Sequence, residues 1–179
     1  MMRSLVVVVS ALIILSFGTL SAQGLYIGAG IGNTFYGVDN LTQQVKSIDK
    51  NATGYKIFAG LSTPTIFGLE GGYRNFGTID ATELNVSIES KTTGWDVYGM
   101  AHFEVLLILD LFAKAGMIFW KTENKVLEQT LGDSGSGFAW GLGAGVGLGP
   151  IGVRLEWENF NINDQVTVSM ATLGATWGF

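Results

Sequence analysis

The stretch from Trp140 to Phe160 reads WGLGAGVGLGPIGVRLEWENF, and its first half alternates small glycines with apolar or aromatic residues. The glycines occupy every second position: Gly141, Gly143, Gly145, Gly147 and Gly149. After Pro150 the alternation resumes with Val153, Leu155 and Trp157 on the apolar positions. Because successive side chains of a β-strand point to opposite faces, this period of two predicts two strands joined by a tight turn.

A glycine-rich stretch can also bind phosphate, but the dinucleotide-binding pattern G-x-G-x-x-G does not fit this one. Its third glycine would fall on Val146, Leu148 or Pro150. We therefore interpret the glycines as the inner face of a strand that leaves room for bulky neighbours. The neighbours expected on adjacent strands are Phe112, Trp120, Arg154 and Glu156.

The same alternation recurs from Leu25 to Phe179 and predicts roughly eight strands of about ten residues, the length of a tilted strand that crosses a bilayer. The predicted strands are 25–35, 55–61, 67–74, 95–103, 111–120, 138–147, 152–158 and 171–179. Short connections (62–65, 104–110, 148–151) alternate with long polar ones (37–53, 75–92, 121–135). This pattern is typical of outer-membrane barrels with short periplasmic turns and longer external loops.

The two faces of the predicted strands differ in chemistry. One face is apolar, and its aromatic residues gather near the strand ends, as in membrane-interface girdles. Near the long connections these are Tyr55, Tyr73, Trp95, Phe119 and Trp157; near the short ones they are Phe67, Phe103, Trp177 and Phe179. The other face carries Lys56, Glu70, Arg74, Asp96, His102, Lys114, Arg154, Glu156 and Glu158. The fold that we predict is all-β: an eight-stranded antiparallel up-and-down transmembrane β-barrel, with a soluble lipocalin-like ligand-binding barrel as the main alternative.

The N-terminal residues have the pattern of a secretory signal peptide. Arg3 precedes an apolar core at 5–17, and the small residues Ser21 and Ala22 precede Gln23. An N-terminal membrane anchor is the alternative, but the apolar run is shorter than the ~20 residues that a spanning helix needs. We expect residues 1–22 to be a cleaved signal peptide and 23–179 to be one barrel domain of the outer membrane.

Composition narrows the possible partners and chemistry. Charged residues make up 14% of the 179 residues, against about 25% in a typical soluble domain. Without Arg3, nine of the ten basic residues remain against 15 acids, so the mature chain carries −6 and nucleic acid is not an expected partner. The chain has no cysteine, which excludes disulfides and thiolate chemistry.

The chain resembles the OmpA-like eight-stranded outer-membrane β-barrel family, as a single-domain member without a periplasmic peptidoglycan-binding domain. The matching segments are LYIGAGIG (25–32), GYKIFAGLSTPTIFGLEGGYRNFG (54–77), LFAKAGMIFWKTE (111–123), GLGAGVGLGPIGVRLEWENF (141–160) and LGATWGF (173–179). The resemblance implies that Phe179 is the signal read by the outer-membrane assembly machinery. It also implies that Glu70 and Arg154 belong to a salt-bridge network in the lumen.

Two positions depart from the family pattern: Met100 stands where the family has a lumen lysine, and Gly147 where it has a second glutamate. Lys114 and Glu156 can substitute, so we expect a differently wired network. Its expected members are Glu70, Arg154, Lys114, Glu156, Lys56 and Asp96.

Four bases and four acids are predicted to face a narrow lumen, where charges should pair because an unpaired buried charge is costly. We therefore expect a solid, ion-paired plug, with a narrow ion-conducting path as the alternative. The pair Glu156 and Glu158 fits a glycosidase dyad or a metal site by spacing, but we expect it to neutralise lumen bases. We expect no cofactor and no metal.

His102 is the only histidine, and no serine follows two residues later, as in lipid A deacylases of similar size. We interpret His102 as a packing residue and expect no enzymatic activity. Function is then expected in the envelope structure or in the polar loops 40–54 and 75–94, which can carry adhesion or binding to host or phage surfaces. These loops contain β-formers such as Val86 and Ile88, and strands that extend beyond the membrane can offer an edge for pairing with such a partner. Outer-membrane lipid and lipopolysaccharide are the other expected partners.

Overall fold

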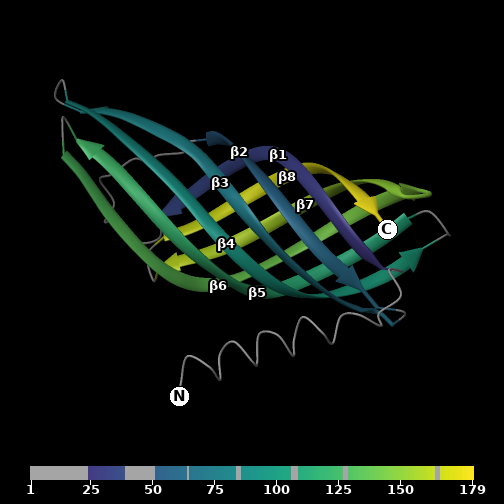
Figure 1. Cartoon of the computed structure of the whole chain (residues 1–179). Coiled ribbons are helices and arrows are strands. Elements are labelled where there is room, and N and C mark those ends of the chain that lie inside the picture. Colours follow the sequence, from purple (N-terminus) through teal and green to yellow (C-terminus); the bar gives the residue numbers. More distant parts are fainter. Residues whose placement is uncertain are drawn as a thin grey trace, which may run out of the picture.

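The computed structural model describes residues 24–38, 51–63, 65–83, 86–105, 109–126, 129–163 and 166–179. The predicted signal peptide and most of the first long connection lie outside these residues. Eight antiparallel strands form a closed barrel in which each strand pairs with its sequence neighbours and β1 pairs with β8 (Figure 1). The strands are β1 (Leu25–Val38), β2 (Asn51–Ser62), β3 (Phe67–Glu83), β4 (Val86–Val105), β5 (Leu109–Val126), β6 (Gln129–Leu148), β7 (Ile151–Asn163) and β8 (Val166–Gly178). The predicted fold class is confirmed.

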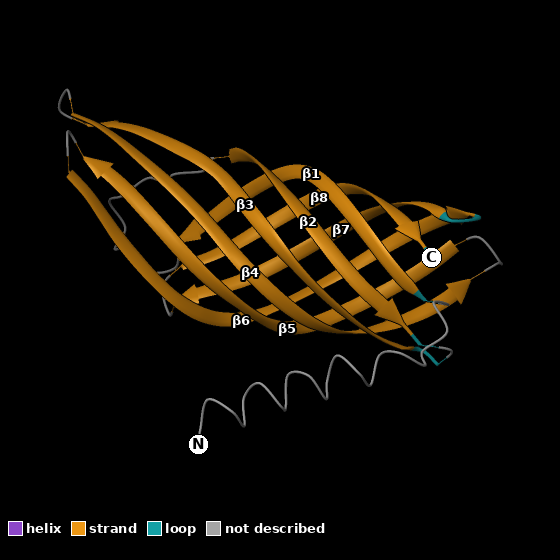
Figure 2. Cartoon of the chain, in the orientation of Figure 1, coloured by secondary structure: helices purple, strands orange, loops and turns teal. Residues whose placement is uncertain are grey.

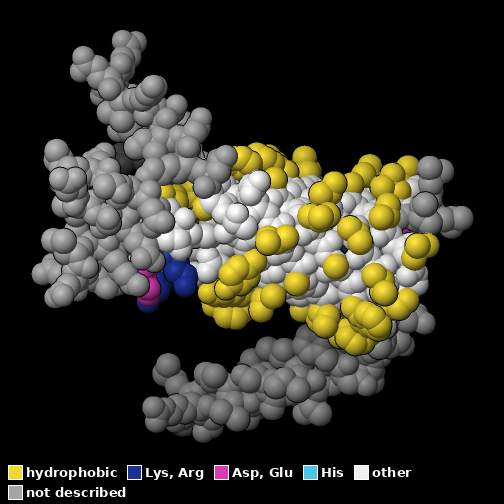
Figure 3. Space-filling view, turned by 90° about the horizontal axis from the view of Figure 1, so that it is seen from above, with side chains coloured by type: hydrophobic (Ala, Val, Ile, Leu, Met, Phe, Trp, Pro, Cys, Tyr) yellow, Lys and Arg dark blue, Asp and Glu magenta, His cyan; other side chains and the backbone are white. Residues whose placement is uncertain are grey.

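The alternation of the sequence places apolar side chains on the outside of the barrel and polar ones inside. On β6, for example, Trp140, Leu142 and Val146 are exposed outward while the intervening glycines face the lumen. Hydrophobic side chains accordingly cover much of the outer wall seen in Figure 3. In the part of the chain that the structure describes, no helix is long and apolar enough to cross a membrane.

The two ends of the barrel differ. The end at which β2, β4, β6 and β8 finish is called here the turn end, and Phe179 lies there, its N–H donating to the carbonyl of Leu25. The opposite end is called the loop end. Of the aromatic residues predicted to flank the apolar face, Tyr55, Trp95, Phe119 and Trp157 lie exposed toward the loop end, and Phe67, Phe103, Trp177 and Phe179 toward the turn end. Tyr73 is half-buried against Trp95, with ring centroids 5.1 Å apart.

The predicted long connections 75–92 and 121–135 are wrong. Strands β3 to β6 have 17, 20, 18 and 20 residues, whereas the other four have 12 to 14. β3 ends at Glu83 and β4 begins at Val86, and β5 ends at Val126 and β6 begins at Gln129. The polar composition of these segments hid their strand character, because they pair with one another beyond the apolar wall. They form the projection of the barrel visible in Figure 2. Two of the short connections are also shorter than predicted, since β5 begins at Leu109 soon after β4 ends at Val105, and β7 begins at Ile151 soon after β6 ends at Leu148. The connection between β2 and β3 has the predicted length.

A β-bulge marks the place where β3 continues into this projection. The register of β3 with β4 shifts between Asn75 and Thr78. Gly77 adopts a φ of 87° there, a conformation that glycine tolerates without steric cost. Its N–H donates to Oδ1 of Asn75 at 2.8 Å. The bulge lets β3 bend away from β2, with which its pairing ends at Asn75.

The glycine run of β6 packs against lumen side chains, largely as predicted. A Cβ atom at Gly143 would overlap the end of the Phe112 ring, and one at Gly145 would contact Arg154 at 3.4 Å. Glu156 lies directly opposite Gly143 in the register with β7. The expectation for Trp120 is wrong, since this indole lies over Gly135, nearer the loop end. In the register of β5 with β6, Trp120 pairs with Gly135 and Lys114 pairs with Gly141, so Trp120 lies outside the glycine run that begins at Gly141.

We expect Gly143→Val to lower the free energy of unfolding by about 1–3 kcal/mol, because the new side chain forces the Phe112 ring out of its place. The matched control is Gly147→Val on the same strand and face, where the nearest atom to a new Cβ is 3.8 Å away. Valine favours strands over glycine, so this variant should be neutral or more stable. Urea unfolding of protein refolded in phospholipid vesicles, followed by tryptophan fluorescence, measures both. Equal midpoints for the two variants would contradict the packing argument.

Candidate functional site

The charged residues of the central lumen come from five strands: the four consecutive strands β2 to β5, and β7. Lys56 lies on β2, Glu70 and Arg74 on β3, Asp96 on β4 and Lys114 on β5. The other three, Arg154, Glu156 and Glu158, follow one another on the inner face of β7. The strand beside them, β6, places Gly145, Gly143 and Gly141 directly opposite these three residues. The space that these glycines leave is filled by Glu158 and Lys114 over Gly141 and by Phe112 over Gly143.

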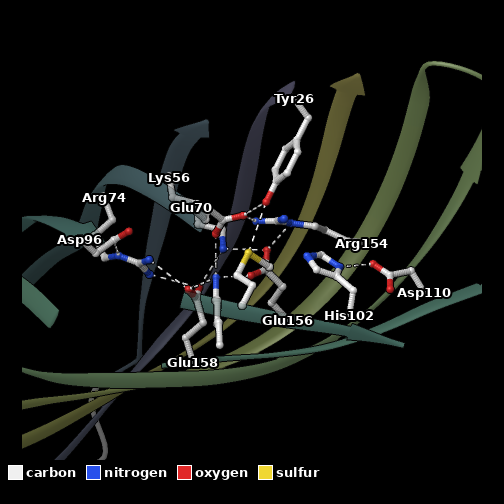
Figure 4. Close-up of polar contacts among 12 residues, drawn as sticks. Tyr26, Lys56, Glu70, Arg74, Asp96, His102, Asp110, Arg154, Glu156 and Glu158 are labelled. Atoms are coloured by element: carbon white, nitrogen blue, oxygen red, sulfur yellow. Dashed lines mark hydrogen bonds and ion pairs between the residues drawn. The ribbon is translucent and has the colours of Figure 1, made fainter. Parts of the chain in front are cut away.

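Glu158 lies at the centre of this cluster (Figure 4). Its carboxylate accepts two hydrogen bonds from the Arg74 guanidinium, at 3.0 and 3.1 Å. It also contacts the ammonium of Lys56 at 3.0 Å and that of Lys114 at 2.7 Å. Arg74 in turn donates from Nε to Asp96. One buried carboxylate thus joins three cations from three strands.

Glu70 and Glu156 hold the half of the cluster nearer the turn end. Lys114 contacts both carboxylates, and Lys56 lies 2.7 Å from Oε1 of Glu156. The Arg154 guanidinium lies 2.7 Å from both Glu70 and Glu156, as an ionic contact without aligned hydrogen bonds. Tyr26 on β1 donates its hydroxyl to Oε2 of Glu70 at 2.9 Å.

Charge in this cluster is balanced and its cations also lie against aromatic rings. The four bases Lys56, Arg74, Lys114 and Arg154 face the four acids Glu70, Asp96, Glu156 and Glu158, and all eight are buried. The Arg154 guanidinium lies 3.8 Å from the centroid of the Phe58 ring, and that of Arg74 lies 4.4 Å from that of Phe160. Four positive and four negative charges make the cluster electrically neutral. Burial and the aromatic rings beside the two guanidinium groups keep solvent out of it. We call these eight residues the ionic plug.

An apolar layer closes the lumen on the loop-end side of the ionic plug. Its buried members include Phe76, Phe160, Ile118, Trp120, Ile162, Val168 and Met170. The indole N–H of Trp120 donates to the carbonyl of Ile162 at 3.1 Å, which satisfies its one polar atom. On the turn-end side, a pocket of about 240 Å³ reaches Tyr26, Phe112 and Arg154. The lumen is therefore open to the turn end only as far as the ionic plug.

The structure brings the six predicted members of the lumen network into one cluster. Glu70, Arg154, Lys114, Glu156 and Lys56 contact one another directly, and Asp96 joins through Arg74. The sequence had placed Arg74 and Glu158 on the inner face without including them in the network. Tyr26 is a further member that the sequence prediction lacks, although it shares the face of Gly28, Gly30 and Gly32 on β1, which is a signal that it faces inward. At the two positions that depart from the family pattern, the Tyr26 hydroxyl contacts the Met100 sulfur at 3.3 Å, and Gly147 pairs with Gly152 of β7.

His102 lies on the inner face of β4 near the turn end. Its Nδ1 is 2.9 Å from Oδ2 of Asp110, and its ring packs against Phe112 at a centroid distance of 5.9 Å. Its Nε2 makes no hydrogen bond to the part of the chain that the structure describes. The histidine is thus held by a carboxylate and an aromatic ring, and no hydroxyl is hydrogen-bonded to it as a nucleophile would be.

The carboxylate pair Glu156 and Glu158 does not have the surroundings of a glycosidase or metal site. Both carboxylates are already occupied by lysine and arginine side chains. Within the described residues, no group of three or more His, Cys, Asp or Glu side chains has an arrangement that holds a metal ion. The chemistry available here is charge neutralisation.

We expect Glu158→Gln to lower the free energy of unfolding by about 3–5 kcal/mol, because it leaves three buried cations with one anion fewer. Glutamine keeps the size of the side chain, so packing is retained. Glu104→Gln, at an exposed position near the turn end, is the matched control and should change stability little. Urea unfolding in vesicles measures both variants, and equal stability of the two would show that the ionic plug does not hold the barrel together.

Comparisons with known proteins agree with this geometry. Residues 21–175 match the family described as OmpA-like transmembrane domain, whereas no curated protein sequence matches significantly. Similar solved structures include Ail, the attachment invasion locus protein of Yersinia pestis, in complex with the heparin analogue sucrose octasulfate (TM-score 0.65, 19% identity, 88% of this chain and 99% of that one). Neisserial surface protein A (0.69, 10%, 89% and 98%) and the N-terminal β-barrel domain of Pseudomonas aeruginosa OprF (0.60, 14%, 88% and 98%) share the fold as well. The chain is therefore an eight-stranded outer-membrane barrel that belongs to the OmpA-like transmembrane domain family.

Proposed function

We propose that this protein is a structural component of the Gram-negative outer membrane whose lumen conducts no ions and which catalyses no reaction. The observation that carries the proposal is the ionic plug. Eight buried charges balance one another in the middle of the barrel, and an apolar layer covers them on the loop-end side. An ion that crossed the lumen would have to separate these pairs and then pass through side chains that bind no ion.

The same arrangement argues against the two alternatives from the sequence. A narrow ion-conducting path needs polar, hydrated walls along the lumen, and the layer around Phe76 and Phe160 is apolar and buried. A soluble lipocalin-like barrel needs a polar exterior and a ligand cavity, whereas here the exterior is apolar and the interior is filled by charged side chains. Among the described residues, no hydroxyl bonds to His102, which supports the proposal that the barrel is not an enzyme.

The placement in the membrane completes the proposal. Residues 1–22 are a cleaved signal peptide, the turn end faces the periplasm and the loop end faces outward. The exposed aromatic residues near both ends of the apolar wall form the two interfacial girdles. Phe179 is the assembly signal, which is supported by its exposure on the outer face at the end of β8. Lipid and the assembly machinery are then the partners of the barrel wall.

We expect the full chain, expressed in a Gram-negative host, to be recovered from the outer-membrane fraction with Gln23 as its first residue and with gel migration that changes on boiling. In planar bilayers, the purified protein should give no stable conductance steps, because the ionic plug and the apolar layer close the lumen. A general porin from the same membrane is the positive control. Recovery from the soluble periplasm would overturn the placement, and a stable large conductance would overturn the closed lumen.

A second candidate function is the binding of a host or phage surface protein. The observation that favours it is the projection of β3 to β6. β7 pairs with β6 only from Ala139 onward, so residues 129–136 at the start of β6 have no β7 partner among the described residues. Unpaired backbone groups of an edge strand can pair with a strand of another protein. Support also comes from Ail, a barrel of the same fold that was solved with a sulfated sugar analogue.

We expect cells that carry the protein to attach to cultured host cells, and to lose attachment when residues 123–132 are replaced by Asn-Gly. This change joins Thr122 to Asp133, which already pair across β5 and β6, and removes part of the free edge. The matched control replaces 81–88 by Asn-Gly, joining the partners Asp80 and Glu89, and leaves the β6 edge intact. Soluble heparin as a competitor separates a sulfated-sugar partner from a protein partner. Unchanged attachment in both variants would leave only the structural role.

A further inference from the structure

The basic residues whose side chains the structure describes divide into two groups. Lys56, Arg74, Lys114 and Arg154 belong to the ionic plug, and each is paired with buried carboxylates. The other two, Lys91 and Lys121, lie exposed on the outer face. They stand on neighbouring strands, where Lys91 pairs with Glu123 and Lys121 pairs with Thr93 in the register of β4 with β5. These two cations are therefore not needed for the barrel interior.

Their position relative to the apolar wall is defined by the strand register. Trp95 and Phe119 pair with each other at the loop-end limit of the wall and are both exposed. Two residues further along each strand, the row on the same outer face contains Thr93, Lys121 and Ser134. Because residues two apart in a strand are separated by about 7 Å, the Lys121 row lies one step beyond the aromatic girdle. Lys91 and Glu123 form the next row.

The outer wall is hollowed at this place. A pocket of about 490 Å³ is lined by Tyr73, Trp95, Phe119, Lys121, Ser134 and Ser136, among others. Figure 3 shows basic and acidic side chains gathered beside the hydrophobic wall, next to the loop end. The pocket thus combines aromatic rings on the membrane side, hydroxyl groups along β6 and a cation above them.

We propose that this pocket binds the phosphate-bearing headgroup of an outer-leaflet glycolipid. Lys121 and Lys91 neutralise the phosphate, and the hydroxyls of Ser134 and Ser136 bond to the sugar. The acyl chains lie on the apolar wall of β5 and β6 below, along Phe138 and Trp140, which are both exposed. The site deepens the proposed function, on which it rests, because a headgroup reaches this level only if the loop end faces the outer leaflet.

Charge complementarity selects this occupant. The chain as a whole is acidic, with a net charge of −5, and would repel an anionic headgroup. The patch has two lysines and one glutamate, and so a local charge of +1. Lys121 lies 2.7 Å from Glu123, but both side chains are exposed, and such surface pairs contribute little. A phosphate, which carries more charge than one carboxylate, can therefore displace this contact. The nearby Asp133 lies on the opposite face of β6 from Ser134, to whose N–H its own carboxylate bonds.

The test is native mass spectrometry of the folded, purified barrel in detergent micelles titrated with diphosphoryl lipid A. We expect Lys91→Gln with Lys121→Gln to weaken binding about tenfold or more, and Lys121→Gln alone to weaken it several-fold. Glu123→Gln should strengthen binding, since it removes the competing anion. Glu104→Gln removes the same charge at the turn end and should leave affinity unchanged. Gel migration before and after boiling verifies that each variant is folded.

Two comparisons give the results that would overturn the proposal. Lipid A without phosphates should bind weakly, and equal binding would show that the lysines do not recognise phosphate. Sucrose octasulfate, which has charge but no acyl chains, should compete poorly, and competition at equal concentration would indicate a soluble sulfated sugar as the ligand. Binding that the double lysine variant retains would also overturn the site. If the variants still fractionate with the outer membrane, such a failure concerns the site alone and leaves the membrane placement intact.

Discussion

The pairing of four cations with four anions inside a narrow barrel is the constraint on which the rest of this structure depends. An eight-stranded barrel has an interior just wide enough for side chains, so each charge must meet its partner without help from water. An unmatched charge would cost several kcal/mol. The barrel therefore needs equal numbers of cations and anions and also a strand register that brings them into contact. Glu158 shows this most clearly, since one carboxylate serves Lys56, Arg74 and Lys114 at once.

This constraint explains the glycine run that first marks the sequence. A Cβ at Gly143 would overlap the Phe112 ring, and one at Gly141 would press against Glu158 at 3.1 Å and Lys114 at 3.2 Å. Glycines at the paired positions of β6 remove the side chains and keep the backbone hydrogen bonds. Glycine weakens a strand taken by itself, but here the loss is offset by the packing of Phe112, Lys114 and Glu158 close to the backbone of β6. The outward residues of β6, such as Trp140 and Leu142, still cover the lipid side. The strand therefore lacks side chains on its lumen face and carries large ones on its outer face.

The sequence predicts the barrel well because the period of two is a local property of each strand. It identifies the faces and hence nearly every inward charge, including Arg74 and Glu158. It does not predict which charges meet, because partners such as Glu70 and Lys114 lie 44 residues apart and meet only through the tilt and stagger of the closed sheet. Tyr26 was missed for the same reason, since its bond to Glu70 crosses from β1 to β3. For the projection of β3 to β6, β-formers such as Val86 and Ile88 indicate strands beyond the membrane, but the bounds of these strands do not follow from the sequence, because polar residues paired above the membrane have no apolar face.

Charged residues in the lumen and charged residues on the outer surface therefore tolerate substitution differently. In the lumen, a change of one charge requires a change in its partners, so the interior is fixed by mutual dependence. Beyond the girdle, Lys91, Lys121 and Glu123 touch water and can be changed without disturbing the ionic plug. A barrel that keeps its charges paired internally leaves its outer basic residues free to meet whatever lies at the membrane surface. The stability of the wall and the choice of partner are then separate properties of one short chain, and selection can act on the second without endangering the first.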